Sequence, residues 1–375
     1  MRRTVDKRRK KAVSYGQKTT EDAGVRKKLA CIFLAALWLL PLVGLGEKQA
    51  VITFLGDCTI GGEEWLRGRD TSFDGYYRAN GPDYFFEKVQ GVIACDDLTV
   101  ANLECVLSPN EGGKVKKTYC FRGLPEYTRV LTGSSVECVN VANNHALDYA
   151  DTGMRRTQDI LDGAGVQWFG SNEVVRKTWI YEKDGVKIGF VGAEIHYWAL
   201  YRPYLLKQIN ALRQEGCQVI VASLHGGAEY GAVRDKGQEN ASHWFVDNGC
   251  DVVIGHHPHV PLGIEVYKNA TICFSLGNFV FGGNAAVKKP RARYTGLFQF
   301  TFSFDDGGKY LGHQLNIIPA FVSSDPLVNH YQPYPVGGED AKAVLQCIQA
   351  DTAFRLKPYA EGVGAVQDFV AAGEK

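Results

Sequence analysis

The sequence predicts a mixed α/β protein in which short buried strands alternate with helices. Apolar runs such as residues 51–55, 98–103 and 217–224 have the roughly four to eight residues of a buried strand. Residues 152–163 and 238–248 have the pattern of helices. Hydrophobic residues make up 45% of the chain, which is enough for a sizeable core. Its 375 residues allow one large domain or two ordinary ones.

The amino-terminal 28 residues are strongly basic. They carry 11 Lys/Arg and 3 Asp/Glu, a net charge of +8, in a chain whose total is +1. The rest of the chain is therefore net acidic, and because the basic excess is local, no nucleic-acid-binding face is expected. Residues 29–46 then contain no charged residue over 18 positions, at the short end of the roughly 20 apolar residues that span a bilayer.

These two segments predict a membrane anchor. A Lys/Arg cluster before an apolar segment holds the amino end in the cytoplasm and directs the following chain outward. A cleaved signal peptide is the alternative. The polar arm is long for a signal peptide, however, and the first strand begins at Val51, which leaves little room for a cleavage site. We therefore expect a single-pass protein of the cell membrane whose main domain is extracytoplasmic.

Side chains that can bind metal ions follow the predicted strands at several points. Gly255-His256-His257-Pro258-His259 follows the apolar run 250–254 and places three imidazoles within four residues. Other strand ends present a carboxylate, an amide or an imidazole in the same position. Because the carboxyl ends of strands converge on one edge of an α/β sheet, we expect these groups to meet. The predicted metal ligands are Asp57, Glu104, Asn144, His225, His257 and His259.

Each of these residues also has a simpler interpretation when it is taken alone. Many strands end in Gly-Asp for turn chemistry, and Glu104 could be a solvated turn residue. The Asn-Asn-His segment could cap the helix at 152–163, with Asp148 or Asp151 as the capping residue. The histidines after residue 254 could be part of a polar loop. The repetition of ligand-type groups at successive strand ends favours a shared site.

The chemistry of the predicted ligands indicates a centre of two divalent ions. Oxygen and nitrogen donors without thiolates suit Mn, Fe or Zn. A bridging carboxylate would hold the two ions roughly 3.5–4 Å apart, where they can activate a bound water. His145, next to Asn144, is then predicted to act as a general acid or to stabilise the leaving oxygen, and Asp148 is predicted to orient its ring. Arg122, between an aromatic residue and a Gly-x-Pro turn, is a candidate for binding an anionic substrate; an ordinary surface arginine is the alternative.

The order of these motifs along the chain resembles the CapA family, which is associated with the synthesis and export of poly-γ-glutamate capsule. The resemblance covers roughly residues 50–320. It implies a membrane location, with the anionic polymer or its synthase complex as partner. The motifs are Gly-Asp (56–57), Asn-Leu-Glu (102–104), Ala-Asn-Asn-His-Ala-Leu-Asp-Tyr (142–149), His-Gly-Gly-Ala-Glu (225–229), Gly-His-His-Pro-His (255–259) and Ser-Leu-Gly-Asn-Phe (275–279).

The CapA family is in turn similar to the calcineurin-like metallophosphoesterases, which implies a four-layer α-β-β-α sandwich of metallo-dependent phosphatase type. The expected organisation is a basic arm (1–28), an anchor (29–46), the phosphatase-type domain (50–320) and a carboxyl-terminal extension (321–375) with one amphipathic helix. The sequence departs from the phosphoesterase pattern at Thr59, where that pattern has the histidine of Asp-x-His, and at Glu104, where it has an aspartate.

Three functions follow from this pattern. The first is a metal-dependent hydrolase or transferase that acts on the capsule polymer. The second is a non-catalytic component that binds the polymer or its synthase on a phosphatase-like fold, and Thr59 favours it. The third is a phosphodiesterase unrelated to capsule.

Overall fold

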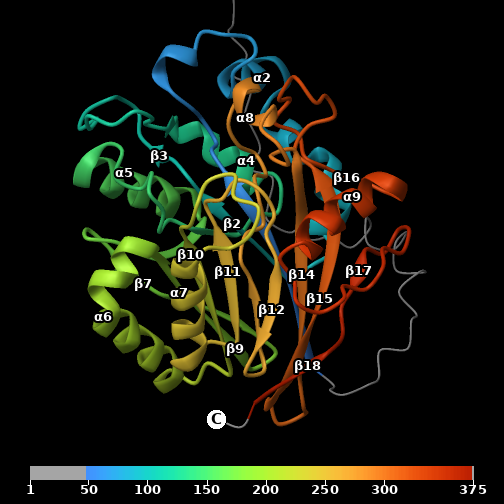
Figure 1. Ribbon diagram of the computed structural model, residues 1–375. Helices are drawn as coiled ribbons and strands as arrows, with labels where there is room; N and C mark the ends of the chain where they lie inside the picture. Colours follow the sequence, from blue (N-terminus) through green and yellow to red (C-terminus); the bar gives the residue numbers. More distant parts are fainter. Residues whose placement is uncertain (1–47, 374–375) are drawn as a thin grey trace, which may run out of the picture. The chain divides into compact units, whose positions relative to one another are not determined.

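A computed structural model of the chain describes residues 48–373, and these residues form one 16-stranded sheet with helices on its outer faces (Figure 1). The main path of the sheet runs, in order, through β12 (Ile264–Tyr267), β13 (Ala270–Cys273), β11 (Val252–His256), β10 (Val219–His225), β9 (Val186–Glu194), β6 (Gln167–Ser171), β5 (Cys138–Asn140), β2 (Leu98–Leu103), β1 (Lys48–Cys58), β14 (Tyr294–Phe304), β15 (Tyr310–Phe321) and β16 (Tyr334–Pro335). The remaining strands of the sheet are β7 (Arg176–Lys177), β8 (Trp179–Lys183), β17 (Ala365–Val366) and β18 (Val370–Ala371), and a separate pair is formed by β3 (Val106–Leu107) and β4 (Arg122–Gly123).

A narrow seam divides the sheet into two halves. Strands β6 and β9 share one pair of partner residues, Ser171 and Ala193. On one side of the seam, the first half contains β6, β5, β2, β1, β14 and β15; on the other side, the second half contains β9, β10, β11, β13 and β12. The strands of each half that adjoin the seam pair in parallel, so their carboxyl ends lie at the same edge.

Successive side chains along a strand point to opposite faces of the sheet. The apolar side chains of the 16-stranded sheet therefore divide among three clusters. Val221 of β10 belongs to a central cluster that draws on both halves of the sheet, whereas its neighbour Ile220 faces the helices outside the second half. Phe54 and Leu55 of β1 divide in the same way. The outer helices are α2 (Phe73–Asn80), α3 (Gln90–Ile93), α4 (Thr128–Thr132) and α5 (Ala150–Ala164) over the first half, and α6 (Ile195–Gln214) and α7 (Lys236–Asp247) over the second.

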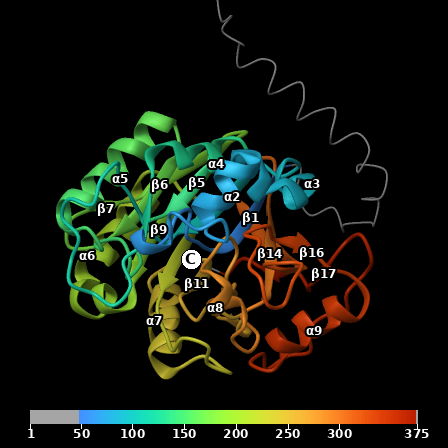
Figure 2. The same cartoon turned by 90° about the horizontal axis from the view of Figure 1, so that it is seen from above.

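The predicted α/β class is confirmed, with one difference in the layering. Helices cover both outer faces, and two β layers enclose the central cluster, as a four-layer arrangement requires. The β layers are joined by hydrogen bonds into one curled sheet, however, because β6 connects β5 to β9. In Figure 2, α5 and α6 lie on the opposite side of the molecule from α9 (Gly338–Gln349).

The segment after residue 320 is part of the same core. Val344, Leu345 and Ile348 of α9 are buried in the central cluster, and β16, β17 and β18 all pair with β15. The other short elements of residues 48–373 are α8 (Asn284–Val287), η2 (Glu64–Leu66), η3 (Pro82–Phe85), η4 (Glu87–Val89) and η5 (Pro125–Tyr127). None of the helices in this range has the length and apolar character needed to cross a bilayer, and the predicted anchor at 29–46 lies outside it.

Two local predictions have different outcomes. The dipeptide Asp184-Gly185 is a strong sequence signal for a two-residue hairpin turn. It forms the turn between β8 and β9, and both residues have the positive φ angles, 52° and 75°, that such a turn requires. The predicted cap of α5 is wrong. Tyr149 is the N-cap residue and makes no side-chain hydrogen bond to the helix, because the carboxylate of the nearby Asp148 is bonded elsewhere.

Candidate metal centre

The predicted ligands meet at the carboxyl ends of β1, β2, β10 and β11. Asp57 lies on β1 beside Asn102 of β2, and His225 at the end of β10 lies beside His256 of β11. Each half of the sheet therefore supplies part of the site. The carboxylates and Asn144 come from the first half and its loops, and the imidazoles come from the second.

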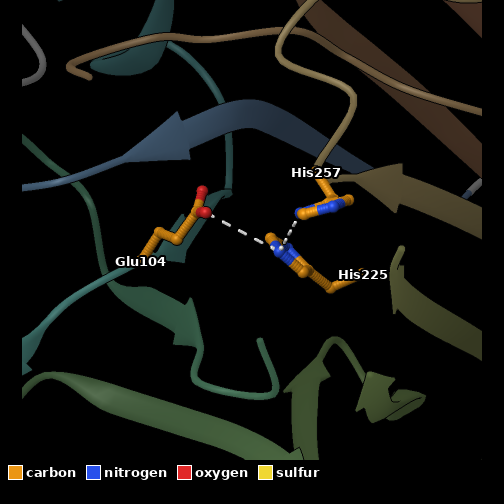
Figure 3. Close-up of side chains that lie close together, drawn as sticks. All are labelled: Glu104, His225 and His257. Atoms are coloured by element: carbon orange, nitrogen blue, oxygen red, sulfur yellow. Dashed lines mark hydrogen bonds and ion pairs between the residues drawn. The ribbon is translucent and has the colours of Figure 1, made fainter. Parts of the chain in front are cut away.

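One group of donors surrounds the Nε2 atom of His225 (Figure 3). This atom is 3.1 Å from Nδ1 of His257, 3.0 Å from Oδ1 of Asn144 and 3.7 Å from Oε1 of Glu104. The ligand atoms of Glu104, His225 and His257 all lie within 4.8 Å of one another, and Oδ1 of Asn144 lies beside that of His225. Such a set suits a divalent transition ion.

A second group shares Glu104 with the first. The ligand atoms of Asp57, Glu104 and His259 also lie within 4.8 Å of one another. All three side chains are buried. Asp57 is held in place by Nδ2 of Asn102, 2.9 Å from its Oδ1, and by the backbone N–H of His257, 3.2 Å from its Oδ2. Glu104 is therefore placed to face both groups.

The His257-Pro258-His259 segment holds its two rings in an unusual backbone conformation. His257 has a φ angle of 95° and His259 one of 59°, both in the left-handed region that residues other than glycine seldom adopt. Such conformations cost of order 1–3 kcal/mol each and persist where the surroundings enforce them, often at functional sites. The ring centroids of His257 and His259 are 5.7 Å apart, so both imidazoles face the same region.

Glu104 is the observation that best tests whether the site fits a metal ion. Both of its carboxylate oxygens are buried, and neither has a hydrogen-bond partner among the described residues. Burial, together with the negative charge of Asp57, raises the pKa of Glu104 well above its ordinary value. An unpaired buried carboxylate is costly, and a cation between it and the imidazoles would offset that cost. The donor set therefore fits a divalent ion.

The titration states of the other donors also suit metal binding. Burial lowers the pKa of His257 to about 4 and that of His225 well below its ordinary value, so both imidazoles are neutral near pH 7. Burial opposes ionisation of Asp57, but hydrogen bonds from His256 and His259 outweigh it and hold the pKa of Asp57 well below its usual range. A neutral imidazole and an ionised carboxylate are the forms that bind metals.

His145 lies next to the metal-ligand groups with one nitrogen free to face them. Its Nδ1 atom is 2.6 Å from Oδ2 of Asp148, and since that carboxylate can only accept, Nδ1 carries the proton. Nε2 lies 3.9 Å from Oε1 of Glu104. The ring of Phe121 stacks on His145 at 4.1 Å between centroids. Burial lowers the pKa of His145, although the hydrogen bond that its Nδ1 donates to Asp148 opposes this shift.

A cavity of about 580 Å³ opens beside the site, with His145 and His259 in its wall. Aromatic side chains, among them Trp65, Tyr119 and Phe121, line much of it, and the cations Arg69 and Lys289 lie in the lining. The carboxylates Glu63, Asp74 and Glu229 are also part of the lining. Such a space admits a sizeable ligand.

Arg122 does not line this cavity. Its side chain is buried on β4, where it donates to both carboxylate oxygens of Glu64 and to the carbonyl oxygen of Ser108. These bonds tie loops together. Its substrate-binding role stays a prediction that this placement does not favour.

Other residues at the site were not predicted from the sequence. Lys117, on the loop between β3 and β4, donates to Asp148 at 2.9 Å. Asn278 places its Oδ1 3.0 Å from Nδ1 of His259. Asn102 holds Asp57, and Glu229 lies near His257 and His259. Asn278, Asn102 and Glu229 all belong to the motifs of the family resemblance, so their presence in those motifs was an available signal.

Comparisons with known proteins agree with this picture. A profile of the family described as "Bacterial capsule synthesis protein PGA_cap" matches residues 51–283. The capsule biosynthesis protein CapA of Bacillus anthracis is 27% identical over 68% of this chain and 66% of its own length. The PGA biosynthesis protein CapA of Bacillus subtilis is 28% identical over 66% of this chain and 69% of its own length. The matched region thus spans about two thirds of these relatives.

Among solved structures, the NAD nucleotidase of Haemophilus influenzae aligns over 82% of this chain and 57% of its own, with 11% identity and a TM-score of 0.40. The profile covers well over half of the chain and includes every predicted metal ligand, and it confirms the resemblance inferred from the motifs. The chain belongs to the bacterial capsule synthesis protein PGA_cap family.

Proposed function

We propose that this chain acts in the synthesis or export of poly-γ-glutamate, an anionic capsule polymer, as a metal-dependent hydrolase or transferase. The family match and the names of the two Bacillus relatives support the link to the polymer. The observation that carries the metal-dependent part is the buried, unpartnered carboxylate of Glu104 between two groups of donors.

The proposed centre contains two divalent ions of Mn, Fe or Zn type. Glu104, His225 and His257, with Asn144 beside them, would hold one ion, and Asp57, Glu104 and His259 would hold the other. When bound, such ions lower the pKa of a water molecule and stabilise negative charge on a reacting oxygen. The side chains need no large movement for this, because their donor atoms already lie within 4.8 Å of one another in each group.

His145 is proposed to move the proton of the reaction at its Nε2 atom. Asp148 fixes the tautomer by accepting from Nδ1, so Nε2 is the nitrogen that can accept a proton from a substrate or return it. The lowered pKa of His145 keeps it neutral at pH 7 before reaction. The stacked Phe121 ring covers one face of the imidazole and limits its rotation.

The proposed location is the outer face of the cell membrane. It depends on the basic arm at 1–28 and the apolar segment at 29–46, which predict an anchor with the cytoplasmic end first. A domain beginning at β1 would then lie close to the membrane and to a polymer synthase there.

The experiment that tests this function measures metal content and hydrolysis by the purified protein, with phosphoesters and γ-glutamyl polymer as substrates. Glu104→Gln is expected to lose bound metal and activity, and His145→Ala is expected to lose activity and keep the metal. His196→Ala is the matched control, because that side chain is 87% exposed and outside the site. A wild-type protein that binds no transition metal and cleaves neither substrate would exclude the enzymatic proposal.

A non-catalytic role is the second candidate, and Thr59 is the observation that favours it. Its hydroxyl donates to the carbonyl oxygen of Glu104 at 3.2 Å, in the position where the phosphoesterase pattern has an imidazole ligand. In that case the domain would bind the polymer or the synthase. Polymer binding by the wild type that His145→Ala leaves unchanged, without hydrolysis by either protein, would support this role.

A further inference from the structure

One carboxylate near the metal centre is not at a strand end. Glu229 lies on the loop between β10 and α7, is exposed, and lines the cavity beside His259. A carboxylate oxygen of Glu229 and ring nitrogens of His257 and His259 all lie within 4.8 Å of one another. Its charge also acts on Glu104, where it opposes ionisation.

The loop that carries Glu229 is fixed to residues 256–258 at both ends. The N–H of Gly226 donates to the carbonyl oxygen of His256 at 3.0 Å, and the N–H of Tyr230 donates to that of Pro258 at 2.8 Å. These two bonds keep Glu229 beside the imidazoles, since it lies between them in sequence.

Arg291 also holds this loop in place through hydrogen bonds to its backbone. Its guanidinium donates to the carbonyl oxygens of Gly231 at 2.8 Å and of Tyr230 and Ala232 at 3.3 Å. Tyr230 itself has a φ angle of 58°, so the backbone turns sharply directly after Glu229. The backbone position of Glu229 is therefore enforced by the fold, whereas its side chain is exposed to solvent.

Glu229 shares one ring with each of the two groups of donors described above. His257 belongs to the group of Glu104 and His225, and His259 belongs to the group of Asp57 and Glu104. Thr59 adds no donor here, because its hydroxyl is engaged by the backbone of Glu104. The unpartnered oxygens of Glu104 indicate that this region is built for a cation. We propose that Glu229 is a further ligand of the metal centre, on the cavity side, beside His257 and His259. This inference rests on the proposed metal centre.

A carboxylate beside His257 and His259 changes which ion the centre prefers. It makes the ligand set harder and more negative than the two imidazoles alone. Carboxylate-rich sites favour Mn²⁺ or Mg²⁺, whereas imidazole suits Zn²⁺.

The test compares Glu229→Gln with wild type for Mn²⁺ stoichiometry and affinity, measured by elemental analysis after gel filtration and by calorimetric titration. Wild type is expected to bind two Mn²⁺ per chain. Glu229→Gln is expected to bind one with unchanged affinity and the other roughly 10–100-fold more weakly, as for loss of a supporting group at a metal site. Glu182→Gln, an exposed substitution on β8, is the matched control.

Each outcome separates this inference from the function on which it rests. If wild type and Glu229→Gln bind two ions equally well, Glu229 is not a ligand and the metal centre stands. If wild type binds no ion, the metal centre itself is wrong. Melting in the presence of a chelator checks folding, and Glu229→Gln is expected to match wild type there because the side chain is exposed.

Discussion

The His145 imidazole is held by contacts that leave only its Nε2 atom facing the metal-ligand groups. Asp148 accepts from Nδ1 of His145 and from the backbone N–H of Phe121, and it pairs with Lys117. One carboxylate thus fixes the ring, the loop that carries the stacked Phe121, and a lysine. The removal of its charge should disturb proton transfer more than it disturbs the fold.

We predict that Asp148→Asn lowers the catalytic rate roughly 10–100-fold, the usual effect of losing an orienting carboxylate. His145→Ala should lower it about 10²–10⁴-fold, the range for loss of a general acid–base residue. The double variant should be no slower than His145→Ala, because Asp148 acts through His145. Initial rates with γ-glutamyl polymer or a phosphodiester provide the measurement. Additive losses in the double variant would contradict this relation.

At the scale of the strands, the end of β1 is held in place by a close approach of two backbones. A Cβ atom added at Gly56 would lie 2.0 Å from the carbonyl oxygen of Gly277. The N–H of Asp57 donates to that same oxygen at 3.0 Å, and Asp57 accepts from Phe279 at 2.8 Å. The position of the Asp57 carboxylate therefore depends on the absence of a side chain one residue earlier.

Gly56→Ala is expected to destabilise the protein by roughly 1–3 kcal/mol, because the backbones must move apart, and to weaken metal binding through Asp57. Gly163→Ala on α5 is the control, since its added Cβ meets no atom within 4 Å. That variant should gain roughly 0.5–1 kcal/mol, because alanine favours a helix. Chemical unfolding of both proteins measures the difference, and equal stabilities would disprove the effect at Gly56.

The interior between the two β layers contains a titratable group far from the metal centre. His313 of β15 is fully buried among aromatic rings, with Thr271 Oγ1 2.7 Å from its Nε2 and the hydroxyl of Tyr310 2.5 Å from its Nδ1. Burial lowers the pKa of His313 from 6.5 to about 4. The folded protein therefore resists protonation of this ring, whereas the unfolded chain accepts a proton near pH 6.5.

The sign of the resulting pH dependence follows directly. Above pH 6.5 the ring is neutral in both states and costs nothing; as the pH falls towards 4, the unfolded state gains protons first and stability is lost. Between those values His313 should remove about 3 kcal/mol. His313→Gln should lack this loss. Urea unfolding at several pH values checks it, and parallel curves for wild type and variant would refute it.

The sequence predicted the elements well where local rules determine them. Asp184-Gly185 predicted a turn because both residues tolerate positive φ angles. The sequence could not show that Asp148 bonds to His145 and not to the first turn of α5, since both partners are equally near to it along the chain. Nor could it show that Arg122 is enclosed by Glu64, which lies 58 residues away. Glu229 was not predicted as a ligand, because its position near the imidazoles depends on hydrogen bonds that join its loop to Pro258 and Arg291.

At the scale of the whole molecule, the carboxyl-terminal residues complete the core. Val344 and Ile348 of α9 are fully buried in the central cluster. A fragment of residues 48–320 would lack α9 and would leave the apolar side chains of β14 and β15 that pack against this helix exposed to solvent. Burial of one such side chain is worth about 1.5–3 kcal/mol, and a domain has only about 5–15 kcal/mol in total.

We therefore predict that residues 48–320 do not unfold cooperatively, whereas residues 48–373 do. Calorimetry and near-ultraviolet circular dichroism would distinguish the two. Lys342→Ala in the longer chain is the control, because its side chain is 60% exposed on the same helix and should have little effect. A sharp calorimetric transition of the shorter fragment would show that α9 is dispensable.

The seam between β6 and β9 implies that a metal ion at the strand ends would also hold the two halves of the sheet together. The two halves of the sheet share the single pair Ser171–Ala193 there, while the carboxylates and imidazoles face one another across the strand ends. An ion bound by ligands from both halves would hold the two halves together at the edge of the sheet where the strands end. Removal of this ion would increase local opening at that edge before the interior opens. Amide protons near the ends of β2 and β10 would therefore exchange with solvent soonest in chelator.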